Sequence, residues 1–254
     1  MRLTTKELSK RTWPDYSRFF SQGNGWDHCA CTAYQGVRSR SGSFADQRDV
    51  NLATKCHLLE RGLAHGILVY AGSEPVGWCQ FGPKGELPIP RTAKPLPDNV
   101  QNNVWRITCF CTMKNYREQG VAELALRAAL DAIRKRGGGI VTAHAVVGLQ
   151  HDQVLDDLIR EHGGVSAEVL RHAKKRFGAT DVIAYDRRAW SVGGVLVHGL
   201  GPVWATVRRG ASASHTGSMG MFERARFRAT GVIEPTSRKL PLSRLVMERT
   251  VRGS

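Results

Sequence analysis

The sequence predicts an α+β fold, and three observations support that prediction. Residues 67–82 contain two short apolar runs around a turn, which is typical of a β-hairpin. Residues 104–113 form a buried strand-like run, and residues 121–136 follow with apolar residues at helical spacing. A short helix and two strands are predicted after residue 218. The chain therefore contains both strand patterns and helix patterns, and the two alternate along the sequence.

Two helices are predicted before the hairpin. Residues 4–20 read as a helix disturbed at Pro14, and residues 44–66 read as a longer helix ending at Gly66. A glycine-bounded loop with two aromatic residues, 23–36, separates them. The apolar positions expected to face the core in the second helix are Val50, Leu52, Ala53, Cys56, Leu59 and Leu63.

The central part of the chain reads as loop, strand, helix and strand. Residues 83–103 carry five prolines and form the loop. In the strand that follows, alternation predicts one face made of Trp105, Ile107, Cys109 and Cys111. Three successive glycines stop the helix after residue 136, and a second strand is predicted at 140–147.

Residues 148–213 are predicted to be an insertion within a single domain that covers residues 1–254. Two helical patterns and several short strands occupy this stretch. Because inserted segments tend to lie at loops and to carry specificity, we expect it to cover a substrate pocket or to mediate homodimer contacts.

The chain carries a formal net charge of +15 at pH 7, which favours an anionic partner or cofactor. The basic excess is spread out and forms no basic tail, so a nucleic-acid-binding arm is not expected; a basic folded face is the alternative. The first residues lack the apolar core of a signal peptide, and no run reaches the roughly 18 apolar residues of a membrane span. We therefore expect a cytoplasmic protein without a membrane segment.

Six cysteines are expected to be free thiols in that reducing location. Cys29 and Cys31 form one Cys-x-Cys pair beside His28, and Cys109 and Cys111 form another in the predicted strand. Zinc sites usually use cysteines separated by about two to four residues. Buried apolar cysteines are therefore favoured, zinc is the alternative at each pair, and we expect no metal.

The stretch "NYREQGVAELALRAAL", residues 115–130, carries the clearest chemistry. A strand enters a short polar loop, and the loop delivers the chain to a helix N-terminus whose first N–H groups are unpaired. The helix dipole adds partial positive charge there, so an anion fits. Gly120 allows close approach, Ala122 is small, and Arg117 adds a cation. A plain helix start is the alternative reading. The Walker, Rossmann and nucleophile-elbow motifs are all absent from the sequence.

Arg117-x-x-Gly120-x-Ala122 resembles the acyl-CoA-binding motif of the GNAT superfamily of N-acetyltransferases, which reads [QR]-x-x-G-x-[GA]. The order of hairpin, strand, motif, helix, strand, late helix and two strands is similar to that family as well, as are the stretches "EPVGWCQFGP" and "GMFERARF". The resemblance implies a mixed, mostly antiparallel central sheet with helices on both faces. It also implies that two parallel strands, 104–113 and 140–147, splay apart to bind acetyl-CoA.

The resemblance implies where acetyl-CoA binds. Backbone groups near the end of the first strand would pair with pantetheine, and N–H groups of the loop would hold the pyrophosphate. Ser218 and Phe222 lie on the late helix, where family members contact the cofactor. Phe222 stands where the family often carries a tyrosine acid, and it cannot donate a proton. The implied cofactor-binding residues are Cys111, Thr112, Met113, Arg117, Glu118, Gln119, Gly120, Val121, Ala122, Ser218 and Phe222.

On the acceptor side, His144 is the candidate general base, because it lies near the C-terminal end of the second strand, close to the predicted splay, and histidine has a suitable pKa. A structural role within the strand is the alternative. Trp26, Asp27 and His28 are expected to line the acceptor site, and His215 is a further candidate. The resemblance thus implies acetyl transfer from acetyl-CoA to a primary amine of a small molecule. A protein or aminoacyl-tRNA amine is the alternative acceptor, and a non-catalytic CoA-binding module is the other alternative.

Overall fold

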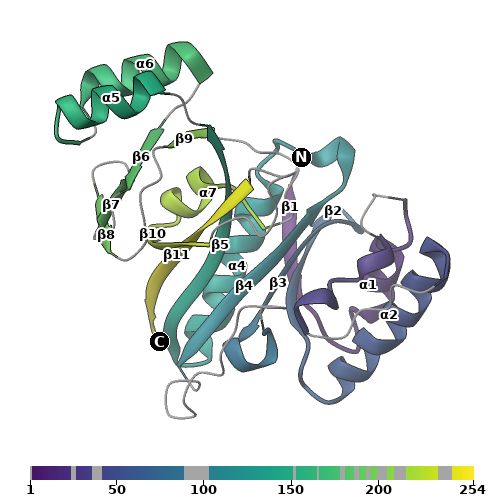
Figure 1. The fold of residues 1–254 in the computed structure, drawn as a ribbon. Helices are drawn as coiled ribbons and strands as arrows, with labels where there is room; N and C mark the ends of the chain where they lie inside the picture. The colour runs from purple at the N-terminus through teal and green to yellow at the C-terminus, as the bar shows by residue number, and fades with distance from the viewer. Residues whose placement is uncertain are drawn as a thin grey trace. The chain divides into compact units, whose positions relative to one another are not determined.

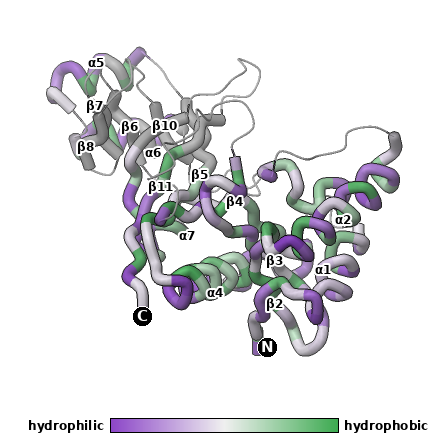
Figure 2. The backbone as a smooth tube through the Cα atoms, turned by 90° about the horizontal axis from the view of Figure 1, so that it is seen from below, coloured by the Kyte–Doolittle hydropathy of each residue, from purple (hydrophilic) through white to green (hydrophobic). Residues whose placement is uncertain are grey.

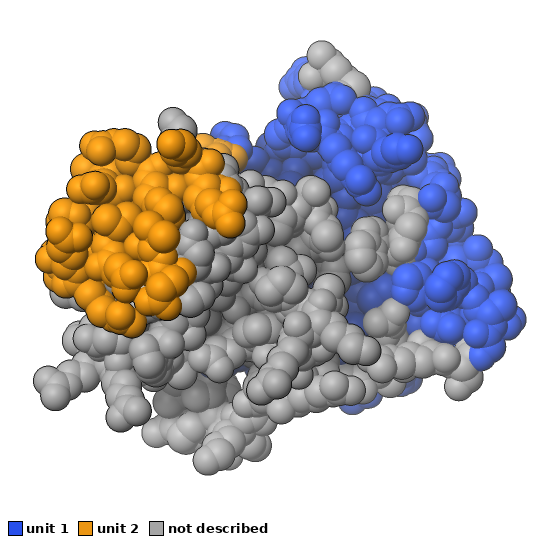
Figure 3. Space-filling view, turned by 45° about the horizontal axis from the view of Figure 1, so that its top comes forward, with its two compact units in different colours: residues 1–142, 250–254 blue, residues 143–249 orange. Residues whose placement is uncertain are grey.

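The computed structural model resolves the chain into two compact units, residues 1–142 with 250–254 and residues 143–249, coloured blue and orange in Figure 3. The residues that the structure describes are 2–23, 27–35, 42–88, 103–150, 153–164, 166–177, 181–185, 189–192, 195–198, 205–208, 216–233 and 242–254. Trp26 and His215 therefore lie outside the described residues, as does most of the proline-rich loop.

The first unit is built on a sheet whose strands follow one another in sequence order, from β1 to the start of β5 (Figure 1). The pairs from β1 to β4 are antiparallel. The predicted hairpin is confirmed as β2 and β3. The strands are β1 (Leu3–Glu7), β2 (His65–Ala71), β3 (Glu74–Pro83), β4 (Val104–Thr112) and β5 (Gly138–Gln150).

Strands β4 and β5 run parallel where they meet in this unit. The Ile140 N–H donates to the Asn103 carbonyl at 2.8 Å, and the Thr142 hydroxyl donates to the Trp105 carbonyl at 3.2 Å. The partners advance in the same direction along both strands, which defines a parallel pair. The predicted α+β fold, with a mostly antiparallel sheet and one parallel pair, is confirmed.

Helices cover both faces of this sheet. Neighbouring residues of β3 point to opposite faces. Gly77 faces α4 (Val121–Lys135), where an added Cβ would collide with Val121. Trp78 faces α1 (Trp13–Phe19), and its ring packs edge-on against Tyr16 at 4.7 Å. Figure 2 shows the hydrophobic residues along α4, as its amphipathic pattern predicts.

A β-bulge changes which residues of β4 share a face. Gln80 of β3 pairs with Cys109, but the next residue, Phe81, pairs with Ile107, so Thr108 is an extra residue in β4. The extra residue reverses the alternation. The prediction that Cys109 and Cys111 share a face with Trp105 and Ile107 is therefore wrong. Both cysteines face α1, on the side of Trp78.

The two helices predicted before the hairpin are both shorter than expected. Residues 4–20 do not form one helix, because Leu3–Glu7 is β1 and α1 begins at Trp13 with Pro14 in its first turn. The second helix, α2 (Phe44–Glu60), ends before Gly62, whose left-handed φ of 72° turns the chain. Gly66 instead belongs to β2, where the Trp78 ring fills the space that a side chain would need.

The second unit contains the remaining helices and strands of the described chain. In it β5 pairs antiparallel with β9, which also pairs with β6, and β7 joins β6 to β8. The late helix and the two closing strands are confirmed, and β10 pairs antiparallel with β11. The elements are α5 (Gln153–Glu161), α6 (Ala167–Phe177), β6 (Asp181–Tyr185), β7 (Ala189–Val192), β8 (Val195–His198), β9 (Ala205–Arg208), α7 (Met219–Arg224), β10 (Arg228–Ile233) and β11 (Leu242–Arg252).

None of the helices in the described part of the chain combines the length and the apolar character that a membrane crossing requires.

Candidate active site

At the end of β4, one residue presents its backbone N–H and C=O groups to the edge of the strand that lies away from β3. The Met113 N–H donates to the Val76 carbonyl at 3.0 Å, so Met113 points toward β3. Backbone groups alternate in direction along a strand, which turns Cys111 toward β3 as well and Thr112 away from it. Of the three residues predicted to meet pantetheine, Thr112 is therefore the one whose backbone N–H and C=O face outward.

The chain leaves β4 through a short 3-10 turn, η4 (Lys114–Tyr116), and then adopts two left-handed conformations. Glu118 has a φ of 62° and Gly120 a φ of 78°. Glycine takes this conformation without steric cost, but a residue with a Cβ pays about 1 kcal/mol or more. The Gln119 side chain braces the loop by donating to the Asn115 carbonyl at 2.8 Å. The loop is thus held in a specific, partly strained shape.

This loop exposes a row of unused backbone donors at the start of α4. Gly120 is the N-cap residue, and its carbonyl accepts the first helical hydrogen bond from Leu124 at 2.9 Å. Within the part of the chain that the structure describes, the N–H groups of residues 118–122 have no acceptor. Unpaired N–H groups and the positive end of the helix dipole together attract an anion.

Arg117 adds a charged side chain to the same place. Its side chain is exposed and forms no ion pair with any described residue, so it remains available to an anionic ligand. Glu118 is exposed as well. No described atom lies within 4 Å of the position where a Gly120 side chain would start, which leaves room for a ligand against the backbone.

The N-terminus of α4 is fixed by close packing against β3. An added Cβ on Gly77 would collide with the Val121 side chain, so the absence of a side chain lets the helix approach the strand. Val121 is buried at 1% exposure, and six more residues of α4 are buried behind it. The direction of the free N–H groups is therefore set by the core and not by the loop alone.

Asp27 and His28 lie on a second segment of this unit, formed by η1 (Asp27–Cys29) and η2 (Ala33–Gln35). The Asp27 carboxylate accepts from the backbone N–H of Gly23. The His28 ring stacks on Phe44 of α2 with ring centroids 4.8 Å apart. Phe44 is 73% exposed, so this stack lies at the surface.

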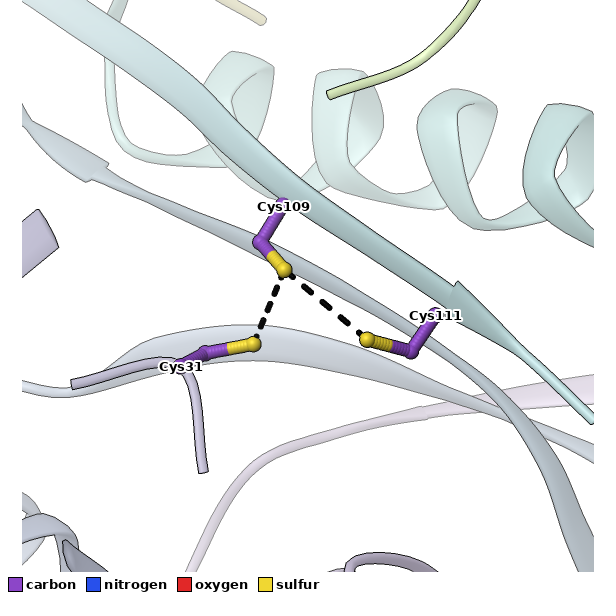
Figure 4. A group of neighbouring side chains, drawn as sticks. All are labelled: Cys31, Cys109 and Cys111. Atoms are coloured by element: carbon purple, nitrogen blue, oxygen red, sulfur yellow. Dashed lines mark hydrogen bonds between the residues drawn. The ribbon is translucent and has the colours of Figure 1, made fainter. Parts of the chain in front are cut away.

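Three thiols join that segment to the end of β4. Cys31 follows η1, and its Sγ lies 2.9 Å from that of Cys109, which in turn lies 3.8 Å from that of Cys111 (Figure 4). All three side chains are buried, and all are free thiols as expected. Burial raises the pKa of Cys31, while hydrogen bonds from Cys109 and Cys31 lower the pKa of Cys111.

The remaining candidate residues belong to the second unit. His144 is buried on β5 at 8% exposure. Ser218 caps α7, because its hydroxyl accepts from the Met221 N–H at 3.4 Å. Phe222 is fully buried and packs edge-on against Phe227 at 5.2 Å. The structure thus brings Cys111 through Ala122 into one continuous strand, loop and helix start, while the late-helix residues lie in the other unit.

Comparison with known proteins identifies the chain. The model of the acetyltransferase (GNAT) family matches residues 15–154, more than half of the sequence. The chain belongs to the GNAT acetyltransferase family. Members of this family bind acetyl-CoA and acetylate amines. The matched region contains β4, the loop from Arg117 to Gly120 and α4. The strand, loop and helix start described above therefore lie within the part of the chain that matches the family.

Solved GNAT-like structures resemble the chain over nearly its whole length at low identity. An N-acetyltransferase from Staphylococcus aureus Mu50 is 11% identical, with 99% of this chain and 100% of that chain covered and a TM-score of 0.49. A ribosomal-protein-alanine N-acetyltransferase from Brucella melitensis is 10% identical, with coverages of 97% and 99% and a TM-score of 0.45.

A ribosomal alpha-N-protein acetyltransferase in complex with coenzyme A is also 10% identical, with coverages of 99% and 96% and a TM-score of 0.45. No curated protein matches the sequence.

Sequence reasoning missed a buried polar stripe on α2 of this GNAT protein. Gln47, Asn51 and Lys55 recur every four residues and are buried, whereas Val50, predicted to face the core, is 51% exposed. The reason is that the stripe meets backbone carbonyls rather than apolar side chains. The sequence signal for this buried face was the set of polar residues spaced four apart in a helix that follows a glycine-rich loop.

Two residues of the stripe hold the 27–35 segment. Asn51 donates to the His28 carbonyl at 2.7 Å. Lys55 donates to the Cys31 carbonyl at 3.3 Å and to the Gln35 side chain. Burial lowers the pKa of Lys55 to about 8. The segment that carries Asp27 and His28 is therefore positioned by buried hydrogen bonds.

Replacing Asn51 by alanine should release this segment. We expect the Asn51→Ala free energy of unfolding to fall by about 1–3 kcal/mol, because the His28 carbonyl loses its donor. Amide hydrogen exchange across residues 27–35 should become faster. Asp49→Ala, an exposed change on the same helix, is the control and should stay within about 0.5 kcal/mol of wild type. Equal effects of the two changes would contradict this role of Asn51.

Proposed function

We propose that this chain transfers the acetyl group of acetyl-CoA directly to a primary amine of a small molecule. The observation that supports the proposal is the loop from Arg117 to Ala122. It combines a left-handed Gly120 at the N-terminus of α4 with N–H donors and an arginine that have no partner among the described residues. A pyrophosphate carries the charge and the acceptor oxygens that such a group of donors requires.

Acetyl-CoA fits the donor side at two further points. Thr112 presents its backbone N–H and C=O away from β3, where the amide groups of pantetheine would add like an extra strand. The open space at Gly120 lets a phosphate approach the backbone of residues 118–122. Glu118, exposed and left-handed, would have to point its carboxylate toward water.

The proposed reaction needs a neutral amine. Its nitrogen lone pair forms the new C–N bond at the thioester carbonyl, the C–S bond breaks, and the sulfur leaves as a thiolate that takes up a proton. The amine must also lose a proton, and we assign its removal to His144. Phe222 has no hydroxyl, so the thiolate receives its proton from another donor or from water.

The acceptor would meet the segment that carries Trp26, Asp27 and His28. A carboxylate beside aromatic rings suits a cationic amine before its deprotonation. We further propose that residues 1–254 act as one acetyltransferase domain, with the inserted 148–213 stretch determining which acceptor enters or mediating contact between two copies.

Placing a carboxylate at Gly120 should weaken cofactor binding. We expect calorimetry with acetyl-CoA to show affinity at least about tenfold weaker in Gly120→Glu, because the new side chain fills the approach and repels phosphate.

Gly137→Glu is the matched control for that experiment. Gly137 is also exposed and left-handed, with a φ of 94°, but it lies at the other end of α4. No atom of the described residues lies within 4 Å of the position of its added Cβ. Its variant should bind acetyl-CoA like wild type. Equal tight binding by both variants would overturn the loop assignment.

Removing the imidazole of His144 should slow the chemistry without weakening donor binding. We expect His144→Ala to lower turnover by about 100-fold or more at unchanged acetyl-CoA affinity. His57→Ala, an exposed change on α2, should leave turnover intact. Unchanged turnover in the His144 variant would remove this residue from the mechanism.

A macromolecular acceptor is the second candidate, and the net charge of +15 is the observation that favours it. A protein amine or an aminoacyl-tRNA amine would then meet the same donor side. The third candidate is a non-catalytic CoA-binding module, because position 222 is phenylalanine where the family often has a tyrosine acid. Formation of an acetylated product with any amine would exclude this candidate.

Salt dependence separates the first two candidates. For a small-molecule acetyltransferase we expect weak RNA binding, measured by fluorescence anisotropy, with no preference for aminoacyl-tRNA. Tight binding with a steep loss of affinity between about 50 and 200 mM salt would instead support the aminoacyl-tRNA acceptor.

A further inference from the structure

The three thiols between the 27–35 segment and β4 form a compact, buried group. The proposed pantetheine contacts at the end of β4 use backbone groups and leave these side chains unassigned. Cys31 comes from the segment, while Cys109 and Cys111 come from β4 after its bulge, and their sulfur atoms converge (Figure 4). The three Sγ atoms all lie within 4.8 Å of one another. We propose that they are the ligands of a divalent, thiophilic metal ion, with zinc as the natural occupant.

The spacing of the sulfur atoms fits one ion. Zinc binds thiolate at about 2.3 Å, so two sulfurs on one ion lie about 3.8 Å apart at the tetrahedral angle and never beyond about 4.6 Å. Cys109 and Cys111 are already 3.8 Å apart. The Cys31 to Cys109 separation of 2.9 Å is shorter than an ordinary packing contact, so these two sulfurs would have to move apart to about 3.8 Å when both bind the ion.

Cys31 lies in a strained stretch of backbone. Ala30 and Cys31 have φ values of 38° and 48°, in the left-handed region that residues with a Cβ avoid. Such a conformation costs about 1 kcal/mol or more for each residue. A thiol that merely filled apolar space would not need it, since buried cysteines pack as small hydrophobic side chains. A metal–thiolate bond supplies a reason for the strain.

The charges around the group also favour a divalent ion. Lys55 is fully buried, and no carboxylate of the described residues forms an ion pair with it. Its ammonium group donates to the Cys31 carbonyl and lies within electrostatic reach of Cys31 and Cys109. Three thiolates and one divalent ion sum to one negative charge, which the positive charge of Lys55 neutralises.

Binding of the ion displaces three protons from the thiols. Each thiol loses its proton to solvent, and three sulfur–zinc bonds form without oxidation or reduction. The fourth position on the ion is left for water or for Cys29, the half-buried thiol two residues before Cys31. The ion would link the segment that carries Asp27 and His28 to β4, independently of any acetyl transfer.

The test is a zinc titration of the full-length, reduced, chelator-treated protein against a chromogenic chelator. We expect wild type to take up one equivalent of zinc, and Cys109→Ser to bind about 100-fold more weakly or worse. Cys79→Ser is the matched control, because Cys79 is an equally buried thiol on β3 outside the group; it should keep full affinity. No zinc uptake by wild type, or equal loss in both variants, overturns the proposal.

Cobalt provides a readout that does not depend on the folding of a variant. Cobalt bound to thiolates of the wild-type protein should give an intense sulfur-to-cobalt charge-transfer band in the near ultraviolet, which added zinc removes. Uptake of cobalt without this band would assign the metal to surface histidines or carboxylates and would overturn the three-thiol site.

Discussion

The close contact between α4 and β3 is the constraint on which the donor side depends. Gly77 lets Val121 lie against the strand, and the left-handed turn at Gly120 then brings the chain from β4 into the helix. The N–H groups of residues 118–122 can point in a fixed direction only because both ends of the loop are fixed in this way. An anion site made of backbone atoms needs little from its side chains beyond Arg117.

The bulge at Thr108 gives β4 two different tasks. Before it, the strand bonds β5 in parallel. After it, the reversed alternation turns Cys109 and Cys111 toward α1 and leaves the Thr112 backbone facing outward. The end of β4 therefore contributes its outer backbone edge to the proposed donor site. The face of β4 toward α1 contributes Cys109 and Cys111 to the three-thiol group. A change in that group would reach the 27–35 segment through Cys31.

Periodicity and turn chemistry were enough to predict the hairpin, β4, α4 and the glycine of the loop. The bulge could not be predicted, since one extra residue leaves the apolar pattern of a strand buried on both faces unchanged. The first strand was predicted as helix because Leu3–Glu7 is short and polar. The buried face of α2 was missed because Asn51 and Lys55 meet carbonyl oxygens that the sequence does not display.

In the proposed function, the donor loop serves a working acetyltransferase. The most direct measurement is the amine-dependent release of free thiol from acetyl-CoA, with mass spectrometry of the product, across small amines, peptides and aminoacyl-tRNA. We expect thiol to be released in step with an acetylated small amine. A protein that binds acetyl-CoA but acetylates none of these acceptors would contradict it.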